Sequence, residues 1–292
     1  MNNYDLIILG GGPGGYNAAF RAAELGKKVA IVDDNNLGGV CLNWGCIPTK
    51  SLLKNAEVMD IINASESYGI SVKDVAVDFE SIVNKSVQAR QRLSKGLHHQ
   101  VKKHNIDFHA GFGTFTDKNT ITVNDTTITA ETFIIATGSK PKTLPSLNIN
   151  DSEVVYAKDI FQMKSIPKSM TIIGAGAIGV EFAYFFNSFG TNVTLIEAED
   201  TILPHEDKEV SQWVEKVFKK KKITVLTGTL ADNIDGEKVL ISIGVEGNST
   251  GMGLKGLGLE FSDNNHIAVN EHGKTNIDNI HAVGDVIGAP WL

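Results

Sequence analysis

Two cysteines, Cys41 and Cys46, lie close together in a segment that reads Gly38-Gly39-Val40-Cys41-Leu42-Asn43-Trp44-Gly45-Cys46-Ile47-Pro48-Thr49-Lys50. A pair this close can alternate between dithiol and disulfide, and a nearby nucleotide cofactor would supply or remove the two electrons. On an ideal helix, residues five apart have Cα atoms roughly 8–9 Å apart, whereas a disulfide tolerates at most about 6.8 Å. We therefore expect the backbone to leave the helical path between them, and Gly45 would permit this. The alternative is two unrelated buried thiols, because free cysteine is common in protein cores.

The elements that would position these cysteines follow one pattern that occurs twice. The segments Gly10-Gly11-Gly12-Pro13-Gly14-Gly15 and Gly174-Ala175-Gly176-Ala177-Ile178-Gly179 each follow an apolar strand and open an apolar-striped helix. Each helix is closed by a glycine, and a second strand then ends in an acid, Asp33 or Glu197. One G-x-G-x-x-G is weak evidence, but two complete units 164 residues apart strongly predict two dinucleotide-binding folds.

The repeated unit has a known physical chemistry. Its first glycine allows a tight turn, its second lets a pyrophosphate approach the backbone, and its third lets helix pack on strand. The helix N-terminus offers N–H groups and a positive dipole to the phosphates, and the acid accepts hydrogen bonds from a ribose. No arginine follows closely after Asp33 or Glu197, so we expect the second site to take NAD rather than NADP. The alternative is a pair of glycine turns that bind no ligand.

The remaining sequence predicts further α/β elements. Residues 51–110 read as mostly helical, with a long amphipathic stretch at 78–104, and residues 112–135 read as short strands joined by turns. The run 133–139 is typical of a buried strand that ends in a small turn, and 279–285 repeats a strand followed by Gly284-Asp285. Residues 266–271 alternate and also predict a strand.

Composition excludes several classes of function. The chain has 292 residues, a net charge of −7 and a pI of about 5.6, so nothing favours nucleic acid or an anionic membrane as a partner. No apolar run approaches the length of a transmembrane helix, and no leader pattern precedes the first strand. We expect a cytoplasmic protein, since a close cysteine pair in a reducing compartment is more often catalytic than structural.

Together these motifs resemble the pyridine nucleotide–disulfide oxidoreductases. The likeness covers nearly the whole chain and rests on G-G-G-P-G-G, G-G-V-C-L-N-W-G-C-I-P-T-K, A-T-G-S-K-P, I-G-A-G-A-I-G-V-E-F and A-V-G-D. It implies an α/β, three-layer fold with two Rossmann-like domains and short β-meander insertions. It also implies an enzyme that uses FAD and NAD and oxidises dihydrolipoamide or a lipoyl-bearing protein. The histidines outside residues 266–271 have no metal-ligand companions in the sequence, so we expect no metal site.

The resemblance also implies roles for individual residues. Cys46 would face the flavin, Cys41 would exchange with the substrate, and Lys50 would sit near flavin N5, paired with Glu181. The FAD site would be formed by Gly10, Gly12, Pro13, Gly14, Gly15, Asp33, Gly39, Val40, Cys41, Cys46, Lys50, Gly113, Thr137, Gly138, Ser139, Gly284 and Asp285. The NAD site would be formed by Gly174, Gly176, Ile178, Gly179, Glu197 and Gly244.

On this basis residues 1–145 and 276–292 are expected to form the FAD-binding domain, and residues 146–275 the NAD-binding domain. Two departures from the family stand out. The family continues into an interface domain that makes its homodimer and supplies a His–Glu acid–base pair, and we expect that domain to be absent here. The link at residues 227–238 is also shorter than the family's meander. We therefore expect a truncated form that is limited to electron transfer between NADH and FAD.

Two other functions stay open from the sequence. One is a related flavin-dependent disulfide reductase or diaphorase with a different acceptor. The other is a non-catalytic flavin-binding module.

Overall fold

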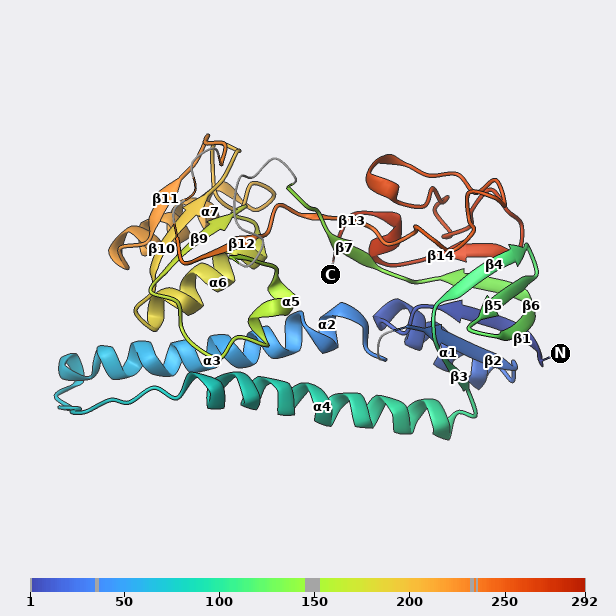
Figure 1. Ribbon diagram of the computed structural model, residues 1–292, viewed down its shortest axis with the longest axis horizontal. Helices are drawn as coiled ribbons and strands as arrows, with labels where there is room; N and C mark the ends of the chain where they lie inside the picture. The colour runs from blue at the N-terminus through green and yellow to red at the C-terminus, as the bar shows by residue number, and fades with distance from the viewer. Residues whose placement is uncertain (1, 35–36, 145–152, 232–233, 235, 292) are drawn as a thin grey trace. The chain divides into compact units, whose positions relative to one another are not determined.

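The structure is a computed structural model that describes residues 2–34, 37–144, 153–231, 234 and 236–291 (Figure 1). Contacts divide the chain into two compact units. Unit 1 contains Met1–Asn43, Arg90–Lys140 and Val245–Leu292, and unit 2 contains Trp44–Ala89 and Pro141–Gly244. The expected boundary at residue 145 and part of the short link at 227–238 lie outside the described residues, and the division by cofactor stays a prediction.

Unit 1 is built on a seven-stranded sheet of order β3-β2-β1-β6-β5-β4, with β14 also paired to β6. Its strands β1, β2, β3, β6 and β14 pair in parallel, whereas β4, β5 and β6 form an antiparallel meander. The elements of this unit are β1 (Asn2–Leu9), α1 (Pro13–Glu24), β2 (Val29–Asp33), α2 (Gly39–Asn43), β3 (Asp107–Ala110), β4 (Gly113–Asp117), β5 (Thr120–Val123), β6 (Thr126–Ile135), β13 (Val245–Gly247), η2 (Asp263–Asn265), β14 (Ile280–Ala282) and η3 (Asp285–Ile287). The strands predicted at 112–135 are therefore confirmed.

The sheet of unit 1 is covered on both faces, as the apolar character of its central strands requires. Ile8 and Ile31 pack on one face with the helical residues Ala19 and Val101. Ile7 and Val32, on the other face, pack with residues from the meander and the C-terminal segment; these include Phe115, Ile121, Leu254 and Val286. This arrangement gives the three layers that the sequence predicts.

Unit 2 is built on a parallel five-stranded sheet of order β11-β10-β9-β12-β8. Its elements are α3 (Cys46–Asn63), η1 (Ser65–Tyr68), β8 (Val154–Val155), α5 (Ala157–Ile160), β9 (Ser169–Ile173), α6 (Ala177–Ser188), β10 (Asn192–Ile196), α7 (Lys208–Lys220), β11 (Thr224–Leu226) and β12 (Lys238–Ile241). One face packs Ile172 and Leu195 against helical residues that include Leu52 and Phe182. The opposite face packs Ile173 against Leu144, Ala231 and Ile234. The described part of the short link therefore helps to cover a face of the sheet.

The helix α4 (Phe79–Lys103) belongs to unit 2 up to Ala89 and to unit 1 from Arg90 onward. Its first half lies beside α3 in Figure 1, and Val83 joins Leu52 in one apolar cluster. This helix confirms the amphipathic stretch predicted at 78–104. The short strand β7 (Ser139–Pro141) pairs with β13.

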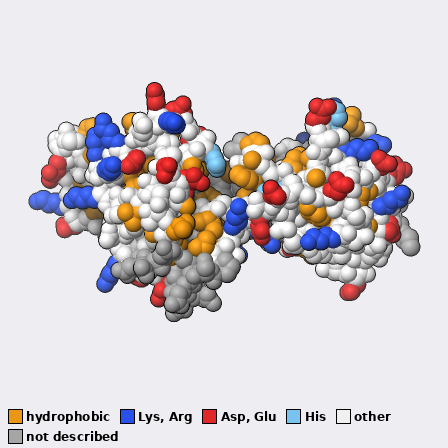
Figure 2. All heavy atoms as spheres, turned by 90° about the horizontal axis from the view of Figure 1, so that it is seen from above, with side chains coloured by type: hydrophobic (Ala, Val, Ile, Leu, Met, Phe, Trp, Pro, Cys, Tyr) orange, Lys and Arg blue, Asp and Glu red, His pale blue; other side chains and the backbone are white. Residues whose placement is uncertain are grey.

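The surface carries charges of both signs. Figure 2 shows acidic and basic side chains interspersed over the face that it draws. Within the described ranges, no helix is both long enough and apolar enough to cross a membrane.

The prediction of a strand at residues 266–271 is wrong. Ile267 forms only an isolated bridge with Phe261, and its N–H donates to the Val286 carbonyl at 2.9 Å. Asn264 and Asn265, with φ of 55° and 59°, turn the backbone directly before this segment, and Ile267 pairs across that turn at a single bridge.

Candidate dinucleotide and dithiol sites

The two glycine turns lie where the central strands β1 and β9 meet the helices α1 and α6. Gly10 and Gly174 adopt φ values of +101° and +95°, which disfavour any residue with a Cβ. A Cβ at Gly10 would also collide with the Ala136 carbonyl, and one at Gly174 with the Ser242 carbonyl. The same conformation therefore recurs in both units, as the repeated sequence predicts.

The third glycine of each turn allows close packing. A Cβ on Gly15 would collide with the carbonyl of Gly10, and a Cβ on Gly179 with that of Gly174. Each helix thus begins directly against the strand that precedes it, so its N-terminus lies at the carboxyl edge of the sheet.

The second glycine of each turn is the helix N-cap. Gly12 and Gly176 have extended φ/ψ values of −73°/−177° and −70°/−174°, and no described side chain caps either helix. Pro13 opens α1 at a position where its missing N–H costs nothing. An added Cβ at Gly176 meets no heavy atom within 4 Å. The exposed backbone and the uncapped N–H groups fit a pyrophosphate.

The acid at the end of the second strand is bonded to its own glycine turn in both units. The Asp33 carboxylate accepts a hydrogen bond from the N–H of Gly11 at 2.5 Å. The Glu197 carboxylate accepts one from the N–H of Ala175 at 2.6 Å, and its other oxygen accepts one from Glu199 N–H at 3.0 Å. Each carboxylate is thereby fixed beside the helix N-terminus, where a ribose would follow the pyrophosphate.

Other predicted residues gather at the same edge of unit 1. The Ser139 hydroxyl donates to the Asp285 carboxylate at 3.0 Å. Gly284, with φ of +80°, and Gly138, with φ of +71°, leave open space where a Cβ would stand. Val283 lies beside Gly14 at the start of α1. A Cβ added at Gly14 would be 3.3 Å from Cγ1 of Val283. The turn that ends β14 therefore lies beside the first glycine turn.

The structure adds one residue, Asn248, to this edge. The Thr137 hydroxyl donates to the Asn248 carbonyl at 2.7 Å, and Asn248 N–H donates to the Gly138 carbonyl at 2.9 Å. Asn248 lies 111 residues from Thr137, so no local pattern could have found it. Gly113 lies in β4, where an added Cβ would stand 3.1 Å from Leu9.

The backbone leaves the helical path between the cysteines, as predicted. The helix α2 ends at Asn43 and α3 begins at Cys46, with Gly45 at φ −117° and ψ −118° between them. Cys41 is half-buried and Cys46 is exposed. Cys41 belongs to unit 1 and Cys46 to unit 2.

The two residues before Cys41 are also placed by the structure. Gly39 starts α2 with φ of +59°, and its Cβ would lie 2.7 Å from the Cα of Gly12. Val40, the next residue, is exposed. The cysteine segment therefore begins in contact with the first glycine turn, inside unit 1.

The predicted partners Lys50 and Glu181 meet within unit 2. The Lys50 Nζ donates to Glu181 Oε1 at 2.6 Å. Lys50 lies four residues after Cys46 on α3, so both side chains share one helix face. Glu181 lies two residues after Gly179 on α6. The ion pair thus links the cysteine helix to the helix of the second glycine turn.

The two remaining predicted residues lie in unit 2. Ile178, in the first turn of α6, is exposed, and Gly244 follows β12 with φ of +98° and no heavy atom within 4 Å of an added Cβ. Its carbonyl accepts a hydrogen bond from Lys142 N–H at 3.0 Å.

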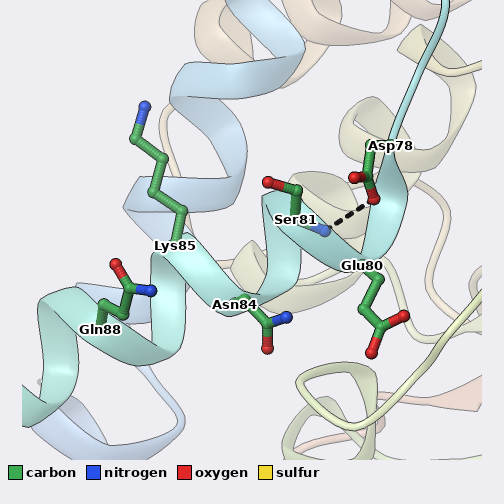
Figure 3. A pocket seen from close by; sticks show the side chains of 6 residues that line it. All are labelled: Asp78, Glu80, Ser81, Asn84, Lys85 and Gln88. Atoms are coloured by element: carbon green, nitrogen blue, oxygen red, sulfur yellow. Dashed lines mark hydrogen bonds between the residues drawn. The ribbon is translucent and has the colours of Figure 1, made fainter.

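A hollow elsewhere in unit 2 is lined by residues near the start of α4 (Figure 3). Its side chains are those of Asp78, Glu80, Ser81, Asn84, Lys85 and Gln88. All six come from one stretch of chain, and Asp78 accepts the Ser81 N–H at 2.9 Å as a helix cap does. The hollow is therefore formed by the first turns of α4 and their cap alone. Among the described residues, no group of three or more His, Cys, Asp or Glu could hold a metal ion.

Comparisons with known proteins agree with this geometry. Residues 4–292 match the model of the family described as "Pyridine nucleotide-disulphide oxidoreductase". Among curated proteins, the chain is 39% identical over 317 residues to a dihydrolipoyl dehydrogenase from Zymomonas mobilis subsp. mobilis, and the match covers 100% of this chain and 68% of that protein. The dihydrolipoyl dehydrogenase of Bacillus subtilis is 38% identical over 324 residues, which cover 99% of this chain and 68% of the relative.

Solved structures show the same fold. The Cu(II) complex of the HOCl-induced flavoprotein disulfide reductase RclA from Escherichia coli has a TM-score of 0.89 and 25% identity, over 100% of this chain and 68% of that one. LpdA from Mycobacterium tuberculosis has a TM-score of 0.90 at 22% identity, over 100% and 69% of the two chains.

Proposed function

The chain belongs to the pyridine nucleotide–disulfide oxidoreductase family, and we propose that it is a dihydrolipoyl dehydrogenase that uses Cys41 and Cys46 as its redox pair. It is a flavoprotein oxidoreductase whose cofactors are FAD and NAD. The observation that carries the proposal is the pair of matching glycine turns, each with its acid bonded to the turn, in a chain that also carries a close cysteine pair.

We assign the binding of each nucleotide to residues of one unit. In unit 1 the backbone at Gly12 would bind the FAD pyrophosphate, Asp33 the ribose, and Asp285 a hydroxyl of the ribitol. In unit 2 the backbone at Gly176 and the Glu197 carboxylate would do the same for NAD. FAD, when bound, would carry two electrons between the cysteines and the nicotinamide.

The dithiol chemistry is carried by the chain itself. Oxidation of dihydrolipoamide would break its two S–H bonds and form one S–S bond, while the Cys41–Cys46 disulfide opens to two thiols. Two electrons and two protons pass to the cysteine pair in this exchange. When the cysteine pair is reoxidised to the disulfide, two electrons and one proton would pass to NAD as a hydride, and the second proton would be released. Because Lys50 carries a positive charge, it would stabilise negative charge on a reduced ring near it, and Glu181 would hold its ammonium in place.

The substrate is the finer part of the proposal. The curated relatives are named for dihydrolipoyl oxidation, and a lipoyl group on a carrier protein is the corresponding macromolecular substrate. A close cysteine pair in a reducing compartment is more often catalytic than structural, so we propose that the protein is cytoplasmic.

A related disulfide reductase with another acceptor is the second candidate. It is supported by the similarity to the flavoprotein disulfide reductase RclA. NADH oxidation with lipoamide, with other disulfides and with a dye acceptor separates the two functions.

The proposal is tested by reducing the purified protein anaerobically with dihydrolipoamide or NADH. We expect two electrons to release two alkylatable thiols and to produce a long-wavelength absorbance. Cys46→Ser should abolish this band, whereas Cys41→Ser should leave or strengthen it, and both variants should still reduce dyes with NADH. Reversal of the two outcomes would exchange the roles of the cysteines, and two-electron reduction without new thiols would refute the redox pair.

A further inference from the structure

Asn43, the last residue of α2, is held on two sides within unit 1. Its side-chain Nδ2 donates to the Gly39 carbonyl at 3.0 Å and to the Leu37 carbonyl at 3.3 Å. Its own carbonyl accepts a hydrogen bond from Nη1 of Arg90, on α4, at 3.1 Å. Asn43 is only 4% exposed. Loss of a partner would therefore leave a buried polar group less well satisfied, which is costly.

This network holds α2, the helix that carries Cys41. The helix has only five residues, and a helix this short does not persist without outside contacts. At its first residue, Gly39, the backbone packs on Gly12 of the first glycine turn. At its last residue, Arg90 binds the terminal carbonyl. The position of Cys41 is therefore set by contacts at both ends of α2.

We propose that Arg90, acting through Asn43, is a positioning residue for the thiol–disulfide chemistry of Cys41. The inference rests on the proposed function, since it requires Cys41 and Cys46 to be the redox pair. A disulfide forms only when the two Cα atoms come within about 4.4–6.8 Å. If α2 is not fixed at its end, Cys41 samples more positions, and the effective concentration of one thiol at the other falls. Arg90 thus favours disulfide closure.

The experiment measures the thiol–disulfide equilibrium of the full purified chain in glutathione buffers. Closure of the disulfide breaks two S–H bonds and forms one S–S bond; glutathione disulfide accepts the two electrons and two protons and becomes two glutathione molecules. Samples equilibrated at each ratio are alkylated, and the free thiols are counted by mass spectrometry. The same samples are followed by thermal unfolding, so that stability is measured separately from the equilibrium.

We expect Arg90→Ala to shift the equilibrium toward the dithiol by about threefold to tenfold, which is the net effect of losing one hydrogen bond at the end of α2. Arg90→Lys should restore most of the wild-type value, because an ammonium can still donate to the Asn43 carbonyl. Arg92→Ala is the matched control. It removes the same charge from an exposed position on the same helix, and we expect the wild-type equilibrium.

The inference would be overturned if Arg90→Ala folds and its thiol–disulfide equilibrium stays within about twofold of the wild-type value, because the lost hydrogen bond should shift it further. If Arg90→Ala does not fold, Arg90→Gln is judged by the same criterion. If the wild-type chain forms a Cys41–Cys46 disulfide and the Arg90 variants have the same thiol–disulfide equilibrium, only the positioning role is refuted. A wild-type chain that forms no such disulfide at any ratio refutes both the proposed function and the inference.

Discussion

The Lys50 ammonium lies 2.6 Å from the Glu181 carboxylate and joins α3 to α6, with the two side chains 61% and 26% exposed. A pair this open to solvent contributes only about 0–1 kcal/mol to stability. Its importance is therefore positional, because it fixes a positive charge on the helix that begins with Cys46.

We expect Lys50→Met to change the free energy of unfolding by less than about 1 kcal/mol, but to slow flavin reduction by NADH about tenfold or more through loss of a fixed charge. Stopped-flow absorbance of the flavin checks the rate, and urea unfolding checks the stability. Lys54→Met is the control, since Lys54 pairs with Glu57 on the same helix and both are largely exposed. Equal slowing in the two variants would contradict a specific role for Lys50.

Glu197 is expected to make the second site prefer NADH to NADPH by at least about tenfold, since placing a 2′-phosphate against a carboxylate costs about 1–3 kcal/mol. Glu197→Gln keeps an acceptor for the Ala175 N–H but removes the charge, so the preference should shrink. Michaelis constants for both nucleotides test this. Asp33→Asn, the equivalent change in unit 1, should weaken FAD retention and leave the nucleotide preference unchanged. A Glu197→Gln protein with the wild-type preference would exclude Glu197 as its source.

The third glycines should tolerate no side chain. Gly15→Ala would force a Cβ into the Gly10 carbonyl and should release FAD, whereas Gly179→Ala should raise the Michaelis constant for NADH. Gly96→Ala, inside α4 with nothing within 4 Å of an added Cβ, should instead stabilise the fold by up to about 1 kcal/mol. Flavin content and nucleotide titration distinguish the three variants. Full FAD content in Gly15→Ala would show that the first turn is not the flavin site.

Tyr184 should make the protein less stable in strong base. Burial and then the hydrogen bond from its hydroxyl to the Asp60 carboxylate raise the pKa of Tyr184 from 10.0 to about 12. Between these pH values the unfolded chain has lost a proton that the folded chain retains, so stability falls as pH rises through this interval and is unaffected below it. Tyr184→Phe should remove about half of that fall, since the pKa of Tyr4 is also raised to about 12. Urea unfolding at several pH values tests this.

The control for this titration is Tyr68→Phe, because Tyr68 is 73% exposed. It should leave the pH dependence unchanged. If it flattened the curve as much as Tyr184→Phe does, the loss of stability would have a general cause.

Local patterns predicted much of this molecule, because the features concerned depend on residues close together in the chain. The turns at Gly10 and Gly174 each lie 23 residues before their acids, Asp33 and Glu197, and the break at Gly45 lies directly before Cys46. The glycine signals have a steric cause that any backbone must obey, and each acid accepts a hydrogen bond from its own turn. The strands and helices around them could therefore be inferred before any contact was known.

What could not be predicted depends on contacts between distant segments. Arg90 reaches the Asn43 carbonyl across 47 residues, and nothing in either neighbourhood marks the pair. Residues 266–271 alternate like a strand, yet Ile267 donates its N–H to Val286 instead of to a neighbouring strand. In these cases tertiary packing determines the backbone, and alternation of polarity is insufficient.

The repetition of one glycine turn in two units has a practical consequence for experiments. A substitution at a glycine of one turn has a counterpart at the equivalent glycine of the other turn, in the same molecule. A variant damaged in one turn can therefore be assayed for ligand binding at the other. Retained binding at the untouched turn would report that the polypeptide has folded, so each half of the molecule can serve as the internal standard for the other.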